Sequence, residues 1–154
     1  MGLILTALLL PALVGSVLIL GAHRLPARAA GGLALLASAG ALVATIAAIG
    51  TGARIAREWI PELGFTWIFF SDQISAPLLL LTAGITLLVV VHGLRHRPAG
   101  GPAGLYFGLI LLIDCGALAT FWTGDLIVFF IAFEVVLVPM WVLIHRFGDA
   151  HDPG

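Results

Sequence analysis

Five apolar runs, each close to twenty residues long, dominate the hydropathy pattern of the chain. Polar residues fall almost entirely between these runs, which cover about residues 2–21, 29–52, 75–91, 104–123 and 125–145. A helix of about twenty apolar residues rises by about 30 Å, which matches the hydrocarbon core of a bilayer. The pattern therefore predicts an all-α integral membrane protein with five transmembrane helices.

One longer segment, from Thr51 to Asp72, separates the second apolar run from the third. It contains a turn signal at residues 61–64, and aromatic residues alternate with other residues over 65–70. Alternation with period two favours extended structure, and tryptophan favours the membrane interface. We expect a short extramembrane hairpin on the membrane surface, followed by a helix whose N-cap is Asp72 or Ser75.

Composition excludes several classes of function. The chain has 154 residues, of which 61% are hydrophobic and only 10% are charged, and its net charge is −1. This charge favours neither nucleic-acid binding nor a polybasic lipid-binding surface. The single cysteine, Cys115, excludes a disulfide framework, and no metal cluster is predicted. Because the loops are short, residues 1–154 are expected to form a single membrane domain.

The arginines predict the orientation of the helices. If the N-terminus is outside, the outer segments carry Arg54 and Arg57, and the inner segments carry Arg24, Arg28, Arg95, Arg97 and Arg146. Basic residues concentrate in cytoplasmic loops. The distribution predicts a multi-pass protein with its N-terminus outside and its C-terminus in the cytoplasm.

Two acidic residues lie inside apolar runs. Asp114 is ten residues before Gly124 and Glu134 is ten residues after it, so we expect both carboxyl groups at the same depth near the membrane midplane. A charged residue at the centre of a membrane helix costs roughly 2.5–3.5 kcal/mol, and such residues usually have a function. Pro139 follows Glu134 and removes the hydrogen bond to the carbonyl of Val135.

These features leave two interpretations open. In the first, Glu134 handles protons, Asp114 is a candidate second acid, and Pro139 distorts the helix beside them. In the second, each acid is a neutral, hydrogen-bonded group that holds helices together. No arginine or lysine of the chain lies at this depth, and hydrocarbon disfavours a charged carboxylate. At least one of the two acids is therefore expected to be neutral, and the rotation of the helices decides whether they face each other.

The stretch from residue 111 to residue 148 resembles the fourth and fifth helices of the antiporter-like, proton-translocating membrane subunits of respiratory complex I, in particular subunit M (chain 4) of NADH-quinone oxidoreductase. The residues that carry the resemblance are Gly124, Asp125-Leu126, Phe129-Phe130, Phe133-Glu134, Leu137, Pro139-Met140, Leu143-Ile144 and Phe147-Gly148. Asp114 matches a position where this family often has glutamate or glutamine. Residues 58–64 and 72–75 are also similar, although Gln73 stands where the family usually has glycine.

The resemblance implies a non-redox subunit that couples quinone reduction to proton pumping and catalyses nothing alone. In that family the helix-five glutamate, here Glu134, couples to a lysine on a later helix, within about fourteen helices that contain inverted repeats. This chain contains no lysine. It is therefore expected to be the N-terminal portion of a larger fold, as a fragment, a split-gene product or a degenerate copy.

The same resemblance implies the surroundings of the chain. We expect a bacterial plasma membrane, with lipid and the other membrane subunits of complex I as partners. No cofactor, metal, nucleic acid, or direct NADH or quinone site is expected. Two alternatives remain: an Mrp-type cation/proton antiporter or membrane-bound hydrogenase subunit, and a truncated membrane scaffold that transports nothing.

Overall fold

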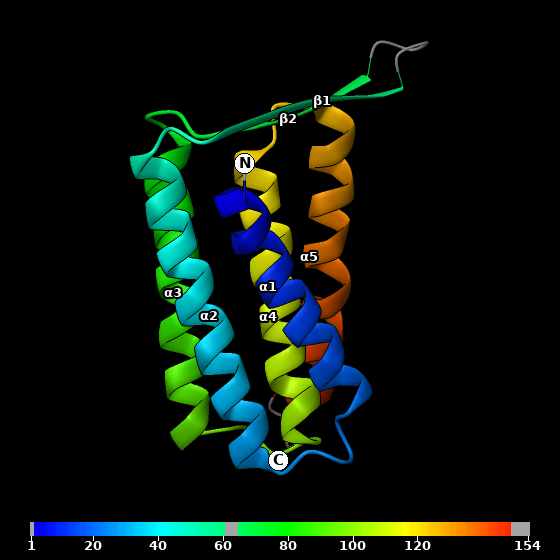
Figure 1. Cartoon of the computed structure of the whole chain (residues 1–154). Coiled ribbons are helices and arrows are strands. Elements are labelled where there is room, and N and C mark those ends of the chain that lie inside the picture. Colours follow the sequence, from blue (N-terminus) through cyan, green and yellow to red (C-terminus); the bar gives the residue numbers. More distant parts are fainter. Residues whose placement is uncertain (1, 61–64, 149–154) are drawn as a thin grey trace.

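The computed structural model describes residues 2–60 and 65–148, and within them it contains five long helices and one pair of strands (Figure 1). The helices are α1 (Gly2–Leu20), α2 (Ala27–Gly50), α3 (Ser75–Arg95), α4 (Ala103–Trp122) and α5 (Leu126–Phe147). All five are long and apolar enough to cross a membrane. The predicted class, five transmembrane helices with a hairpin between the second and third, is confirmed.

Local chemistry explains where several helices begin. Pro26 and Pro102 precede α2 and α4 in extended conformations, which proline favours. The carboxylate of Asp125 accepts hydrogen bonds from the backbone N–H groups of Ile127 and Val128, at 2.8 and 3.0 Å, and so caps α5. Helices α2, α4 and α5 therefore each begin beside a residue whose chemistry favours a helix start.

Asp72 and Ser75 share the start of α3. The carboxylate of Asp72 accepts hydrogen bonds from the N–H groups of Ile74 and Ser75, at 3.1 and 2.6 Å, and the hydroxyl of Ser75 accepts one from the N–H of Asp72 at 2.9 Å. This reciprocal arrangement is a capping box in which Ser75 takes the place of the usual glutamate or glutamine three residues after the first residue, here Asp72. The bonds from Ser75, above all from its backbone, hold the pKa of Asp72 below its usual value of 3.8.

The strands β1 (Arg54–Ile60) and β2 (Phe65–Phe70) form an antiparallel hairpin across one end of the bundle (Figure 1). Arg54 is paired with Phe70 and Arg57 with Trp67, and the register shifts between Glu58 and Ile60. The turn predicted at residues 61–64 lies outside the described part of the chain. The N–H of Gly124 donates to the carbonyl of Ile68 at 2.7 Å, which ties the hairpin to the α4–α5 turn.

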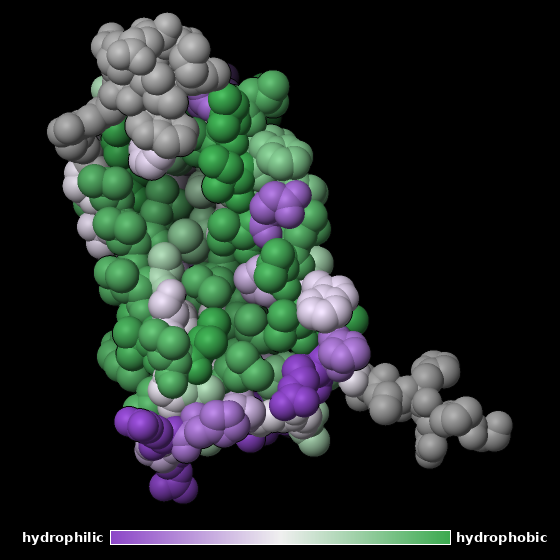
Figure 2. All heavy atoms as spheres, turned by 90° about the vertical axis from the view of Figure 1, so that its right-hand side faces the viewer, coloured by the Kyte–Doolittle hydropathy of each residue, from purple (hydrophilic) through white to green (hydrophobic). Residues whose placement is uncertain are grey.

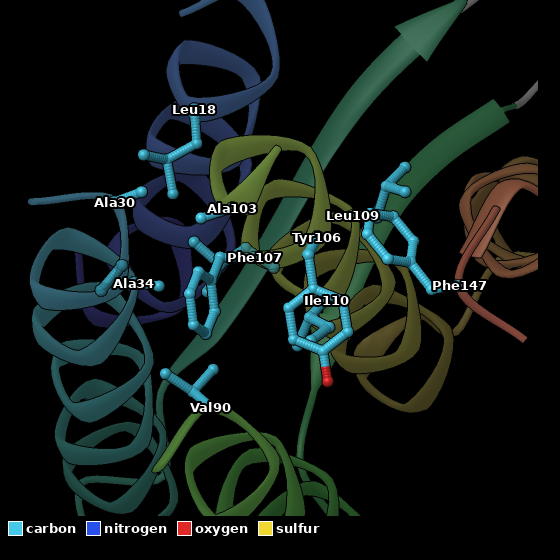
Figure 3. Close-up of a cluster of buried hydrophobic side chains, with 12 residues drawn as sticks. Leu18, Ala30, Ala34, Val90, Ala103, Tyr106, Phe107, Leu109, Ile110 and Phe147 are labelled. Carbon is cyan, nitrogen blue, oxygen red and sulfur yellow. The ribbon is translucent and has the colours of Figure 1, made fainter. Parts of the chain in front are cut away.

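Helix α4 is the centre of the bundle, because it contacts all four other helices. Figure 3 shows the ring of Phe107 between Ala34 of α2 and Val90 of α3. These residues belong to a cluster that we call the far-side cluster, because it lies away from the hairpin. Its members are Leu18, Ala30, Ala34, Ala37, Val90, Ala103, Tyr106, Phe107, Leu109, Ile110, Leu111 and Phe147.

A second cluster lies toward the hairpin and includes Ile55 and Phe69 from the two strands. We call it the hairpin-side cluster. Its members are Ile4, Ala7, Leu8, Ala44, Ala48, Ile55, Phe69, Leu79, Ala83, Leu118 and Trp122. The apolar interior of the bundle is therefore divided into two parts along the helix axes.

Glycines allow α1 and α4 to approach each other closely. A Cβ atom added to Gly108 would lie 2.7 Å from the carbonyl oxygen of Gly15, and one added to Gly104 would lie 2.6 Å from that of Leu18. Such backbone contact requires residues without side chains. Small residues four apart are common where membrane helices pack.

Candidate functional site

The outer surface of α5 is almost entirely uncovered. Of its 22 residues, only Ala132, Pro139 and Phe147 are buried. Figure 2 shows this side of the molecule, where hydrophobic side chains cover most of the surface and hydrophilic ones gather at one end. The face of α5 therefore has the character of a surface that meets lipid or another apolar helix.

Glu134 lies in the middle of this exposed surface. Its side chain is exposed and lines a shallow hollow of about 400 Å³ together with Ile131, Val135, Val138 and Pro139. Helix α5 continues through Pro139, which has no N–H to donate to the carbonyl of Val135. The hollow therefore combines a carboxyl group with a backbone carbonyl that lacks its usual helical partner.

Asp114 has the opposite surroundings, because its side chain is only 1% exposed. The hydroxyl of Thr86, on α3, donates a hydrogen bond of 2.8 Å to Oδ1 of Asp114. Its other oxygen, Oδ2, is buried without a hydrogen-bond partner among the residues that the structure describes. Asp114 therefore links α3 to α4 and keeps one polar atom unsatisfied inside the bundle.

The structure brings α4 and α5 together, but it does not bring the two acids together. A Cβ atom added to Gly116 would lie 3.0 Å from the carbonyl oxygen of Ala132 and 3.1 Å from the nitrogen of Val136, so these residues mark the helix contact. Each acid lies two residues from its own contact position, which is roughly 200° around the helix. Asp114 and Glu134 therefore point away from each other.

The same contact supports the expectation of equal depth. Gly116 is level with the segment between Ala132 and Val136, so Asp114 and Glu134 differ in depth by only about two residues, or ~3 Å. The acids are thus at similar depth on opposite faces. One faces the bundle interior, and the other faces outward.

The sequence interpretation missed Thr86, although a signal for it was present. Thr86 lies fourteen residues before Gly100, in the α3–α4 loop, and Asp114 lies fourteen residues after it. The count that pairs Asp114 with Glu134 across Gly124 also pairs Thr86 with Asp114 across Gly100. Thr86 could therefore have been predicted as the hydrogen-bond partner of Asp114, because the two residues lie at the same depth on neighbouring helices.

Comparisons with known proteins show which proteins this chain is similar to. No family model matches the chain. NAD(P)H-quinone oxidoreductase chain 4 from Prochlorococcus marinus (strain MIT 9312) is 41% identical over 91 residues, which are 59% of this chain and 16% of that protein. The chain 4 protein of Synechococcus sp. (strain WH7803) is 40% identical over 91 residues, with the same coverage. The matched part thus spans about a sixth of the length of these relatives.

A solved structure agrees with the sequence matches. A chain of respiratory complex I from Thermus thermophilus with bound NADH superposes with a TM-score of 0.73 at 26% identity, covering 93% of this chain and 28% of that one. The similarity predicted from the residues around Glu134 is confirmed. The chain is therefore similar to part of NAD(P)H-quinone oxidoreductase chain 4 in sequence and to part of a chain of respiratory complex I in structure.

Proposed function

We propose that this chain forms part of a proton-translocating membrane subunit of NADH:quinone oxidoreductase, of the chain 4 type, and that Glu134 is its coupling acid. The observation that carries the proposal is the position of Glu134, an exposed carboxyl group in the middle of an apolar helix face. A charged residue facing hydrocarbon at mid-helix costs roughly 2.5–3.5 kcal/mol. That cost falls if another protein segment covers this face and offers the carboxyl group a polar or charged partner.

The covering segment is expected to carry a positive charge. Within the described residues, the basic groups of α5 are His145 and Arg146, in its last turn. His145 is eleven residues from Glu134, or about 16 Å along the helix, so it is too far for a direct contact. We therefore propose that a lysine or arginine on a later helix, or on a companion subunit, pairs with Glu134, and that movement of a proton changes the strength of this pair.

The proposal extends to the orientation of the chain in the membrane and to its partners. Segments at one end of the bundle carry Arg24, Arg28, Arg95, Arg97 and Arg146, and the hairpin end carries Arg54 and Arg57. The positive-inside rule then supports an outside N-terminus in a bacterial plasma membrane. Its proposed partners are lipid and other complex I membrane subunits, and we propose no NADH or quinone site within this chain.

The proposal is tested with Glu134→Gln in the assembled complex, with Glu134→Asp as the matched control that retains a carboxyl group. Proton pumping into membrane vesicles is followed by a pH-sensitive dye while NADH oxidation is measured in the same sample. We expect Glu134→Gln to lower both rates at least tenfold, and Glu134→Asp to retain more of both. Wild-type pumping and turnover in Glu134→Gln would contradict the coupling role.

A further inference from the structure

Three of the four buried polar residues in the described part of the chain lie in one layer between the two apolar clusters, and the fourth, Thr45, lies at the level of the hairpin-side cluster. The structure gives four buried polar residues in the described part of the chain, namely Ser38, Thr45, Thr86 and Asp114. Three of them lie, along their own helices, between a residue of the far-side cluster and a residue of the hairpin-side cluster. Ser38 lies between Ala37 and Ala44, Thr86 lies between Val90 and Ala83, and Asp114 lies between Leu111 and Leu118. We call Ser38, Thr86 and Asp114 the polar layer.

A common contact shows that these three residues lie at one level. Cβ atoms added to Gly31 and Gly93 would both meet the ring of Phe107, at 3.4 and 3.2 Å, so α2, α3 and α4 converge there. Seven residues further toward the hairpin is about two full helical turns, which preserves the face of each helix. That step leads to Ser38 on α2, Thr86 on α3 and Asp114 on α4. The hydrogen bond between Thr86 and Asp114 confirms that these two residues, on α3 and α4, lie at the same level.

Helix α1 supplies a further polar group at the same level. Gly15 faces residues 108–112 of α4, and one turn toward the hairpin brings Pro11 level with Asp114. Pro11 is fully buried and has no N–H, so the carbonyl of Ala7 lacks its usual helical donor. In membrane helices such carbonyls are often satisfied by ordered water or by neighbouring side chains.

The hydrogen bonds within the layer are incomplete. Oδ2 of Asp114 is buried and unpartnered, and no bond joins it directly to Ser38. The hydroxyl of Ser38 donates to the carbonyl of Leu35 at 3.2 Å and keeps its oxygen free to accept. A buried polar atom without a partner costs roughly 1–3 kcal/mol, and a buried water with two to four polar partners removes that cost.

We propose that the polar layer binds an internal water molecule between α1, α2, α3 and α4. Asp114 is neutral at this site and donates from its protonated Oδ2 to the water, and the water donates to the hydroxyl oxygen of Ser38 and to the carbonyl of Ala7. Thr86 holds the other oxygen of Asp114 and so fixes the direction of the carboxyl group. This site lies on the inner side of α4, away from Glu134, and it stands independently of the proposed coupling role.

A density map of the full membrane complex, at a resolution that shows ordered water, tests the proposal directly. We expect a density peak within about 3.2 Å of both Oδ2 of Asp114 and the hydroxyl of Ser38. The peak should persist when sodium is replaced by choline. A direct Asp114–Ser38 hydrogen bond or the absence of a density peak would overturn the proposal. A peak that is lost when sodium is removed would also overturn it, in favour of a cation site.

A variant pair gives a second readout that does not depend on the map. Ser38→Ala removes a water contact, and Ser16→Ala removes an exposed serine on α1 whose hydroxyl also donates to a helical carbonyl, that of Ala12, at 2.8 Å. We expect the equilibrium constant for unfolding to rise at least about fivefold more in Ser38→Ala than in Ser16→Ala. Equal effects of the two substitutions would refute the water contact at Ser38.

Discussion

The α1–α4 crossing offers a sharp test of the packing, through Gly108→Ala. The added methyl group would lie 2.6 Å from Cγ1 of Ile19 and 2.7 Å from the carbonyl oxygen of Gly15. Carbon contacts are most favourable at about 3.5–4.0 Å, so the two helices must separate by roughly 1 Å. The carbonyl belongs to the backbone of α1 and cannot rotate away as a side chain can. The substitution therefore affects the whole crossing.

The size of the effect is obtained by comparison with Gly84→Ala on α3. A Cβ atom added to Gly84 meets nothing within 4 Å. Alanine is favoured over glycine inside a helix by roughly 0.5–1 kcal/mol, and this gain is common to both variants. Their difference therefore isolates the steric cost, which for overpacking is about 1–3 kcal/mol. This corresponds to a ratio of unfolding constants of about 5 to 150.

Unfolding of the purified membrane protein by a denaturing detergent in mixed micelles measures this ratio. Tryptophan fluorescence reports the transition, because Trp122, one of the four tryptophans, is fully buried beside the hairpin and becomes exposed on unfolding. We expect Gly108→Ala to unfold at lower detergent fraction than the wild type, and Gly84→Ala at the same or higher fraction. Coincident transitions for the two variants would show that α1 and α4 are not in backbone contact.

Three further predictions concern charged groups. Asp125→Ala should destabilise the protein by about 0.5–2 kcal/mol in the same detergent titration, because α5 loses its N-cap, whereas Asp125→Asn should lose less. The lowered pKa of Asp72 means that its carboxylate stabilises the fold at pH values above 3.8, and this contribution is lost as the pH falls through the folded-state pKa. Stability measured against pH should show this loss in the wild type and not in Asp72→Asn. Asp114→Asn should reduce proton pumping less than Glu134→Gln, because asparagine keeps an oxygen that accepts the Thr86 bond, and an equal or greater loss would reverse that ranking.

The number and class of the helices could be predicted from the sequence because a bilayer sets the length of an apolar run. The ends of the helices were less predictable. Helix α3 continues to Arg95, beyond the apolar run that ended at Val91, because a helix can extend past the hydrocarbon as long as its backbone remains bonded. Leu94 is the one large hydrophobic residue in 92–95, and it is flanked by glycine and arginine, so these residues gave no continuous apolar signal.

The rotation of each helix could not be read from the same pattern. A run that is apolar on every side does not show which face meets its neighbours. Counting residues from Gly124 gave the depth of both acids, but only the contact between Gly116 and Ala132 shows that they point apart. Depth follows from chain length, whereas orientation follows from packing. The direction of Asp114 and Glu134 therefore had to come from the structure.

The burial of the helices runs opposite to their hydropathy, and this contrast separates the two acids. Helix α4 is the least apolar of the five and the most buried, whereas α5 is among the most apolar and the least buried. In a membrane the surrounding solvent is lipid, so polar groups are placed inside and apolar surface outside. Asp114 obeys this rule, since it lies inside with Thr86 as its partner. Glu134 breaks the rule in this isolated bundle, and it would obey it once a helix with a positive charge covers the exposed face of α5.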